Sequence, residues 1–239
     1  LGVGGLNVVN AAAAAQTYTQ KVLALSPLGY WPLNGSANDA SGNGYNGAAT
    51  AVTYGTGIGD GGQAGVFDGS TSFVDIYSAG FAGAFNNQEL TLAIWCKVSA
   101  AGVWADAKAR QVFRLRADNS NIAVLARTAT ANQIQSNYLA GGSTKPINDT
   151  SLAASTAWFH LAVTVSKSGD AEKFYINGAQ VGSTQTGLGT WAGALASNTT
   201  AIGSATNASS GLAWSGSLAH AVIFTSALSA AQVASLAAV

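Results

Sequence analysis

Charged residues are scarce in this chain. They make up 8% of its 239 residues, ten basic and ten acidic, whereas typical soluble domains carry about a quarter. The balance leaves no basic surface, so we expect neither nucleic-acid binding nor attraction to an anionic membrane. Ser, Thr, Asn, Gln and Gly must supply the polar surface, and such a surface resists self-association poorly. It suits a protein covered by neighbouring subunits or matched to neutral sugars; secretion into surroundings that favour uncharged surfaces explains it equally well.

Sulfur-containing residues are almost absent, and long apolar runs are missing. Cys96 is the only cysteine, which excludes an internal disulfide, and it shares a predicted strand face with Leu92 and Ile94 as a buried thiol would. No apolar run is long enough to cross a bilayer, so membrane insertion is not expected. The chain has no Met and opens at Leu1, which indicates processing or an incomplete sequence. No Pro-rich, charged or low-complexity linker divides it, and one domain is the better interpretation.

What is present is a series of alternating apolar segments. In residues 158–165 and 173–182, large apolar residues alternate with other residues as they do in strands. The loop between the two segments has the length of a hairpin loop. Asn177-Gly178 predicts a tighter type I′ turn, because both residues tolerate positive φ. Consecutive hairpins indicate an all-β sandwich. Further strands are predicted at 66–76, as strand, turn and strand, and at 91–98, 111–116, 121–127, 133–138, 199–203 and 216–224.

Both ends of the chain carry helix signals. Residues 1–15, rich in Gly, Val and Ala, form an arm that we expect to pack against another subunit; packing against its own domain is the alternative. Thr17 and Gln20 have the spacing of a capping box, which starts a short helix before Pro27, so residues 1–27 are an arm and a helix. A second capping box, Ser229 with Gln232, predicts a C-terminal helix that packs its apolar stripe against the edge of the sandwich.

Seven short segments follow one another along the chain, at residues 30–33, 39–44, 67–69, 158–162, 174–178, 201–203 and 214–229. In this order they resemble the laminin-G-like branch of the concanavalin A-like lectin and glucanase superfamily. The resemblance implies a jelly-roll sandwich of two antiparallel sheets over residues 28–239. The family includes glycan binders, adhesion modules, domains appended to secreted enzymes, and modules on phage tails and capsids.

Residues for catalysis are sparse. Glycoside hydrolysis usually needs two carboxyl groups, and the glucanases of the superfamily carry a Glu-x-Asp-x-x-Glu strand motif that Glu89 and Glu172 do not form. No Ser or Cys motif accompanies His160 or His220, and we expect His160 to be a hydrogen-bonded structural residue. The one close acid pair on predicted strands, Asp68 and Asp75, has the character of turn residues. The chain is therefore expected not to be an enzyme.

The loop 39–44 is a candidate site for calcium as a cofactor. Asp39 and Asn43 supply oxygen ligands there, as hard cations require. The resemblance implies that relatives bind calcium with such loops, often helped by an acidic pair entering the last strand. Residues 216–220 contain no acid, and the alternative is an Asx-turn in which Asp39 closes the loop.

Sugar binding calls for exposed aromatic side chains beside polar ones that read hydroxyl groups. The candidates in or beside predicted loops are Trp104, Tyr138, Trp191 and Trp214. Trp191, within the Gly-rich stretch 187–193, is expected to be the most exposed. Burial in the core is the alternative for each of them.

The sequence therefore predicts a non-catalytic structural or adhesion protein on the surface of a virus particle (phage capsid decoration or tail), or of a bacterial surface assembly. Its arm would anchor it to copies of itself or to other subunits, and its loops would face neighbours or cell-surface glycans. The alternative is a secreted, extracellular carbohydrate-binding module of a larger enzyme.

Overall fold

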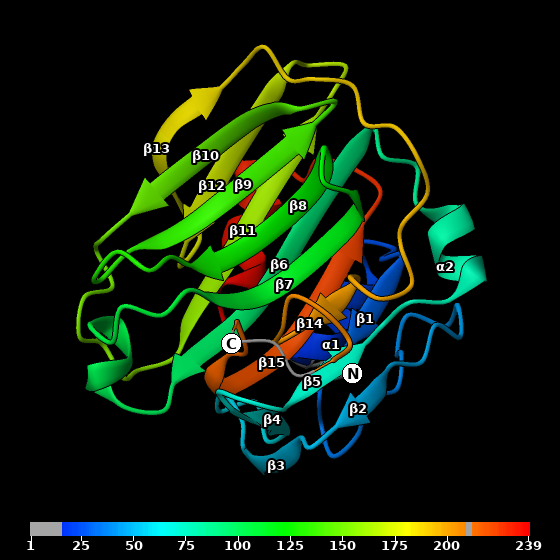
Figure 1. Cartoon of the computed structure of the whole chain (residues 1–239). Helices are drawn as coiled ribbons and strands as arrows, with labels where there is room; N and C mark the ends of the chain where they lie inside the picture. Colours follow the sequence, from blue (N-terminus) through cyan, green and yellow to red (C-terminus); the bar gives the residue numbers. More distant parts are fainter. Residues whose placement is uncertain (1–15, 209–211) are drawn as a thin grey trace, which may run out of the picture.

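The computed structural model describes residues 16–208 and 212–239; the expected packing of residues 1–15 lies outside this part of the chain. Two antiparallel sheets stack face to face, with the green strands β7 to β10 of one sheet in front in Figure 1. The first, sheet A, has the order β13-β12-β11-β6-β15-β4-β3, and β1 pairs with β15. Its strands are β1 (Gly29–Trp31), β3 (Thr53–Thr56), β4 (Gln63–Asp68), β6 (Glu89–Val98), β11 (Phe159–Ser166), β12 (Ala171–Ile176), β13 (Ala179–Gln185) and β15 (Ser215–Phe224).

Sheet B covers the other side of the core, with the order β10-β9-β8-β7-β14-β5-β2. Its strands are β2 (Ala48–Thr50), β5 (Phe73–Asp75), β7 (Arg110–Asp118), β8 (Asn121–Arg127), β9 (Ile134–Ala140), β10 (Ser143–Asp149) and β14 (Ala201–Ile202). Short helices accompany the two sheets: α1 (Tyr18–Leu23), α2 (Ala79–Ala84), α3 (Ala230–Leu236) and a 3₁₀ turn η1 (Ala101–Trp104). No helix among the described residues is long and apolar enough to span a bilayer.

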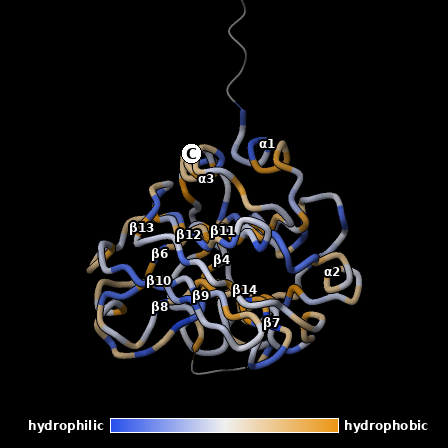
Figure 2. The backbone as a smooth tube through the Cα atoms, turned by 90° about the horizontal axis from the view of Figure 1, so that it is seen from above, coloured by the Kyte–Doolittle hydropathy of each residue, from blue (hydrophilic) through white to orange (hydrophobic). Residues whose placement is uncertain are grey.

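Two apolar clusters hold these layers together. The larger lies between the sheets, where alternate strand residues such as Leu92, Ile94 and Cys96 point inward. The smaller lies on the outer face of sheet A and buries Val22 of α1 and Leu236 of α3 against it. Figure 2 shows α1 and α3 side by side on this face, opposite sheet B. Burial raises the pKa of the Cys96 thiol well above its ordinary value, which confirms the expected inert, buried cysteine.

Local sequence signals are confirmed at the turns and caps. Asn177 and Gly178 both have positive φ, +49° and +81°, as the hairpin turn requires. A Cβ atom on Gly178 would lie 2.9 Å from the Cα atom of Ala234 in α3, so the turn also needs glycine to pass under that helix. Both capping boxes form, Thr17 with Gln20 and Ser229 with Gln232.

The elements differ from the expectations in several places. The C-terminal helix packs on the outer face of sheet A and not at the sandwich edge, because its stripe meets α1 and the face below it. The strands β2, β3 and β10 and the helix α2 were not predicted from the sequence. β10 is an edge strand that contains Pro146 and is largely exposed, so it lacks the apolar alternation by which strands are recognised.

Candidate functional site

A groove of about 250 Å³ runs along β8 on the outer face of sheet B. Its floor consists of β8 side chains that point away from the core, among them Val124 and Ala126. One wall comes from β7 and carries Gln111 and Arg114. Because adjacent strands are about 4.8 Å apart, the backbones of the two walls are separated by roughly 10 Å.

The register of the strands places these residues in two rows across the sheet. Gln111 is opposite Ala126, which is opposite Gln135 of β9. Arg114 is opposite Val124, and Val124 is opposite Asn137. Each row therefore has a polar side chain on one wall, an apolar floor, and an amide on the other wall.

The amides of the β9 wall are oriented by the next strand. Gln135 Nε2 donates to Asn148 Oδ1 at 2.7 Å, and Thr144 Oγ1 donates to Asn137 Oδ1 at 2.9 Å. Each contact uses one of the four hydrogen-bonding positions of the amide, and both side chains line the groove. The groove thus combines fixed neutral donors and acceptors with apolar carbon, which is the chemistry that hydroxylated ligands require.

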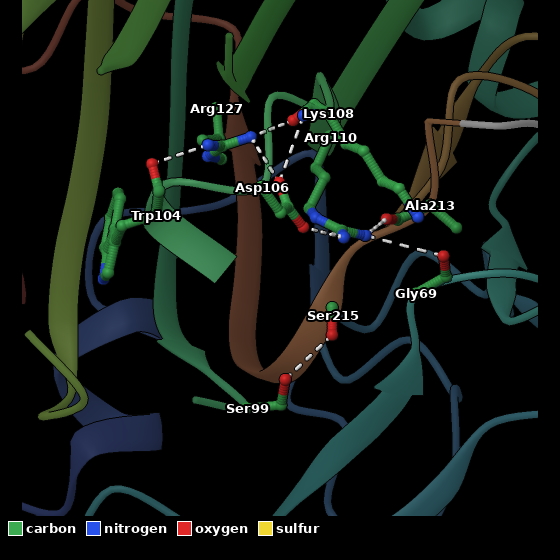
Figure 3. A network of polar contacts seen from close by, with 9 residues as sticks. All are labelled: Gly69, Ser99, Trp104, Asp106, Lys108, Arg110, Arg127, Ala213 and Ser215. Carbon is green, nitrogen blue, oxygen red and sulfur yellow. Dashed lines mark hydrogen bonds and ion pairs between the residues drawn. The ribbon is translucent and has the colours of Figure 1, made fainter. Parts of the chain in front are cut away.

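One end of the groove is fixed by a network of charges (Figure 3). Asp106 accepts hydrogen bonds from Arg110 of β7 and from Arg127 of β8, the latter at 2.9 Å. Arg127, whose side chain is fully buried, also donates to the carbonyl oxygens of Lys108 and Trp104. Partial burial would raise the pKa of Asp106, but the hydrogen bond from Arg110 and the two guanidinium charges hold it below its ordinary value.

The same network joins three loops. Arg110 Nη1 donates to the carbonyl of Ala213 at 3.0 Å and to that of Gly69 at 3.5 Å. Nearby, the hydroxyls of Ser99 and Ser215 are 2.8 Å apart (Figure 3). The loops that follow β4, precede β7 and precede β15 are therefore held against one another at this end of the sandwich.

The four aromatic residues predicted to bind glycans are not exposed. Trp191 is 4% exposed, Tyr138 2%, and Trp104 and Trp214 are fully buried. All four belong to the core between the sheets, where Tyr138 stacks on Trp191 with ring centroids 6.0 Å apart. The expectation that Trp191 is exposed was wrong, because its ring packs inside the core against Phe85 and Tyr138.

Asp39 and Asn43 do lie together, in the loop after β1. The Asp39 carboxylate accepts hydrogen bonds from the backbone N–H groups of Tyr30, Ser41 and Tyr45, and from the Ser41 hydroxyl, at 2.8–3.0 Å. Asn43 Nδ2 donates to the carbonyl oxygen of Leu28 at 3.0 Å. These contacts favour the Asx-turn interpretation. No group of three His, Cys, Asp or Glu suited to a metal ion occurs within the described ranges, and calcium binding at this loop stays a prediction.

Replacing Asp39 with alanine tests the two interpretations of the loop. We expect the free energy of unfolding to fall by about 1–3 kcal/mol, because three backbone donors lose their acceptor. Thermal unfolding should be measured for both proteins with millimolar CaCl₂ and with EDTA. Equal melting temperatures of the unmodified protein in the two buffers are expected; a rise with calcium that Asp39→Ala abolishes would instead establish the ion site.

The two candidate acids, Asp68 and Asp75, accept hydrogen bonds from nearby residues that hold their loops in place. Asp68 accepts hydrogen bonds from Thr71, Ser70 and Ser72, which outweigh burial and lower the pKa of its carboxyl. Asp75 accepts from Tyr77 N–H and from Asn207 Nδ2. These contacts support their interpretation as turn residues, and neither carboxylate faces the groove.

The histidines are buried on the outer side of sheet A. His160 packs edge-on against Trp95, with ring centroids 5.3 Å apart, and both ring nitrogens lack partners among the described residues, contrary to the expected hydrogen bond. Burial, with repulsion from His220, lowers the pKa of His160 to about 3. His220 Nδ1 lies 2.7 Å from the Tyr30 hydroxyl, and its Nε2 lies 2.9 Å from Asp60. Burial lowers the pKa of His220, against the opposing effect of Asp60.

Two stacked antiparallel sheets in this strand order define a jelly-roll β-sandwich. The chain belongs to the concanavalin A-like lectin/glucanase superfamily, whose laminin-G-like family model matches residues 68–234. This confirms the resemblance and the all-β fold predicted from the sequence. No curated protein sequence matches the chain.

Solved structures show the same fold at low sequence identity. Domain 4 of the extracellular arabinanase AbnA from Geobacillus stearothermophilus, in complex with arabinotriose, superposes with a TM-score of 0.66 at 20% identity, covering 89% of this chain and 98% of that domain. The binding domain of Paraclostridial Mosquitocidal Protein 1 matches with a TM-score of 0.66 at 16% identity and covers 90% of this chain. A botulinum neurotoxin serotype D ligand-binding domain in complex with N-acetylneuraminic acid matches at 0.64 and 15%, covering 92% of this chain. The chain spans about half the length of each of the last two domains.

Proposed function

We propose that this protein is a non-catalytic glycan-binding domain and that the groove along β8 holds the sugar. The observation that carries the proposal is the pair of rows in which fixed polar side chains face one another over Val124 and Ala126. A sugar ring presents hydroxyl groups at its rim and C–H groups on its faces, so it matches amide walls and an apolar floor. The complex of the arabinanase domain with arabinotriose supports the same class of ligand.

The composition of the groove supports binding without bond cleavage. None of its lining residues is Asp or Glu, whereas glycoside hydrolysis usually requires two carboxyl groups flanking the bond. The two glutamates of the chain lie elsewhere: Glu172 is buried in the sandwich interior, and Glu89 accepts hydrogen bonds from Ser166 and Ser168. We therefore propose that the domain retains its ligand and leaves it intact.

Amide removal in the groove tests the proposal. A glycan array screened with the full chain identifies a ligand, and the double variant Gln135→Ala, Asn137→Ala should bind it about tenfold more weakly or worse, because each lost hydrogen bond contributes about 0.5–1.5 kcal/mol. Gln180→Ala is the matched control, since it removes an exposed amide from β13 of the other sheet. Equal loss in the control, or no loss in the double variant, would place the sugar elsewhere.

A second proposal concerns anchoring to a virus particle or a bacterial surface assembly. A largely apolar groove of about 300 Å³ between α1 and α3 is lined by Gln16, Leu25 and Ala231, and the N-terminal arm, residues 1–15, joins the described chain at Gln16. We propose that this groove receives the apolar arm of a neighbouring copy. Light scattering should find oligomers of the full chain and monomers of a chain that lacks residues 1–15; a monomeric full chain would exclude this role.

A further inference from the structure

The arginines of this weakly charged protein are not distributed over its surface. The sequence contains four, and all of them lie in the neighbouring strands β7 and β8: Arg110, Arg114, Arg116 and Arg127. Two share the carboxylate of Asp106, as described above. A third, Arg116, donates from Nε to the carbonyl of Asp118 at 3.0 Å and from Nη2 to Asn119 Oδ1.

Like Arg116, Arg114 has no ion pair with a carboxylate of the described residues, but unlike Arg116 it lines the groove. Its Nη1 donates to Gln111 Oε1 at 3.2 Å, and no carboxylate of residues 16–208 or 212–239 lies within 4.0 Å of its guanidinium. The nearest acid in its row is Asp75, which is separated from it by Ala201 of β14 and is occupied by Tyr77 and Asn207. Burial, with repulsion from Arg116, lowers the pKa of Arg114 to about 10, so the group is still charged at neutral pH. A half-buried cation without a counter-ion therefore stands in the wall of the groove.

The remaining donors of Arg114 are suited to an anion. Nε is buried and unpartnered, whereas Nη2 has no partner among the described residues and is not enclosed. The Nη1 and Nη2 end of a guanidinium presents two parallel N–H bonds, which match the two oxygens of a carboxylate. Across the floor residue Val124, the Asn137 amide faces the same space and can bind a hydroxyl group.

From this arrangement we propose that the groove selects an acidic sugar, with Arg114 pairing to the carboxylate while Asn137 and Gln135 bind ring hydroxyls. The inference rests on the proposed glycan-binding function and adds the substrate class. Arg114 contacts the ligand directly and determines specificity. A neutral sugar would leave the guanidinium charge partly desolvated and unpaired, which disfavours it relative to a uronate.

Because the chain has four arginines, its NMR spectrum contains four arginine Nε–H signals. The signal that disappears in Arg114→Gln is that of Arg114. The ¹⁵N-labelled full chain should be titrated with D-glucuronate and D-galacturonate, with D-glucose and D-galactose, and with acetate. We expect the uronates to move the Arg114 signal and the Val124 and Asn137 backbone amides at concentrations at least tenfold lower than the neutral sugars or acetate. In Arg114→Gln this preference should fall to about twofold or less, while Arg116→Gln, on the same strand outside the groove, keeps it.

Three outcomes overturn the inference, and they differ in what else they affect. Equal shifts with neutral and acidic sugars would reject the acidic specificity and leave the glycan-binding proposal standing. Acetate reproducing the whole uronate response would show that a carboxylate alone binds and that the sugar contributes nothing. Absence of any groove shift, together with a negative glycan array, would reject the proposed function and this inference with it.

Discussion

Asp106→Asn is expected to destabilise the fold by about 3–5 kcal/mol, which is the usual cost of leaving a buried charge, here that of Arg127, without its ionic partner. The variant keeps the size and one acceptor oxygen but removes the charge shared by Arg110 and Arg127 (Figure 3). Arg127 has no exposed side-chain surface through which water could replace the lost partner. Its guanidinium would remain charged and buried, which raises the free energy of the folded state and leaves that of the unfolded state unchanged.

Thermal and urea unfolding measure this effect. For a domain of this size, each kcal/mol shifts the melting temperature by roughly 2–4 °C, so a fall of about 6–20 °C is expected. Asp149→Asn is the control, because it removes the same charge from the end of the edge strand β10, where the carboxylate accepts hydrogen bonds from Ser151. A change in Asp106→Asn no larger than that of the control would show that Asp106 is not needed to compensate the two arginines.

Glu172→Gln is expected to stabilise the protein at alkaline pH by roughly 4–5 kcal/mol. Glu172 lies in the interior, where Ser136 donates to its Oε1 at 2.7 Å while Oε2 has no partner among the described residues. Burial raises the pKa of its carboxyl from 4.5 to about 8, against the opposing hydrogen bond from Ser136. Each pKa unit corresponds to about 1.4 kcal/mol, which sets the size of the effect.

The sign follows from proton binding in the two states. Below pH 4.5 the carboxyl is protonated whether the chain is folded or not, so Glu172 does not lower the free energy of unfolding. Between pH 4.5 and about 8 the unfolded chain releases this proton while the folded chain keeps it, so stability falls as the pH rises and then levels off. Glutamine keeps the acceptor for Ser136 and cannot ionise, so its variant should show no such decline.

His160 acts in the opposite direction and provides the comparison. Its pKa of about 3 in the folded state lies below the ordinary value of 6.5, so stability is lost as the pH falls through that interval. Between about pH 4.5 and 6.5 the two effects have opposite slopes and cancel. The free energy of unfolding should therefore be level in this interval and decline on either side of it. Urea unfolding from pH 3 to 9 should show that Glu172→Gln removes the alkaline decline and that His160→Phe reduces the acid one, to which His220, Asp68 and Asp106 also contribute through their lowered pKa values. An unchanged alkaline slope in Glu172→Gln would mean that Glu172 is ionised in the folded protein.

Much of the fold could be predicted because its signals are local. Strands β6, β8 and β11 are apolar segments of strand length in the sequence itself, and the turn at Asn177 depends on the φ preferences of two neighbouring residues. Strand β10 could not be recognised in the same way, because an edge strand has little buried surface to enforce a pattern.

The candidate site was predicted less well. Aromatic residues in or beside loops predict exposed sugar-binding surfaces, yet Trp191 and Trp104 belong to the core. Residue type alone does not distinguish an exposed aromatic side chain from a buried one. Gln135 and Asn137 were missed, although their period-2 spacing within 133–138 places them on one face of a strand. The signal that could have found them is this alternation of polar residues in β9 opposite small apolar ones in β8.

The sequence by itself determined the class of fold, the hairpins, both helix caps and the buried cysteine, since each depends on residues close together in the chain or on one strand's alternation. Only the tertiary structure decided which side chains share the groove, because Arg114, Val124 and Asn137 meet through strand register across three strands. It also decided that Glu172 and His160 are buried, and hence how their protons respond to folding. Solvent exclusion arises from packing of distant segments, and no local pattern encodes it.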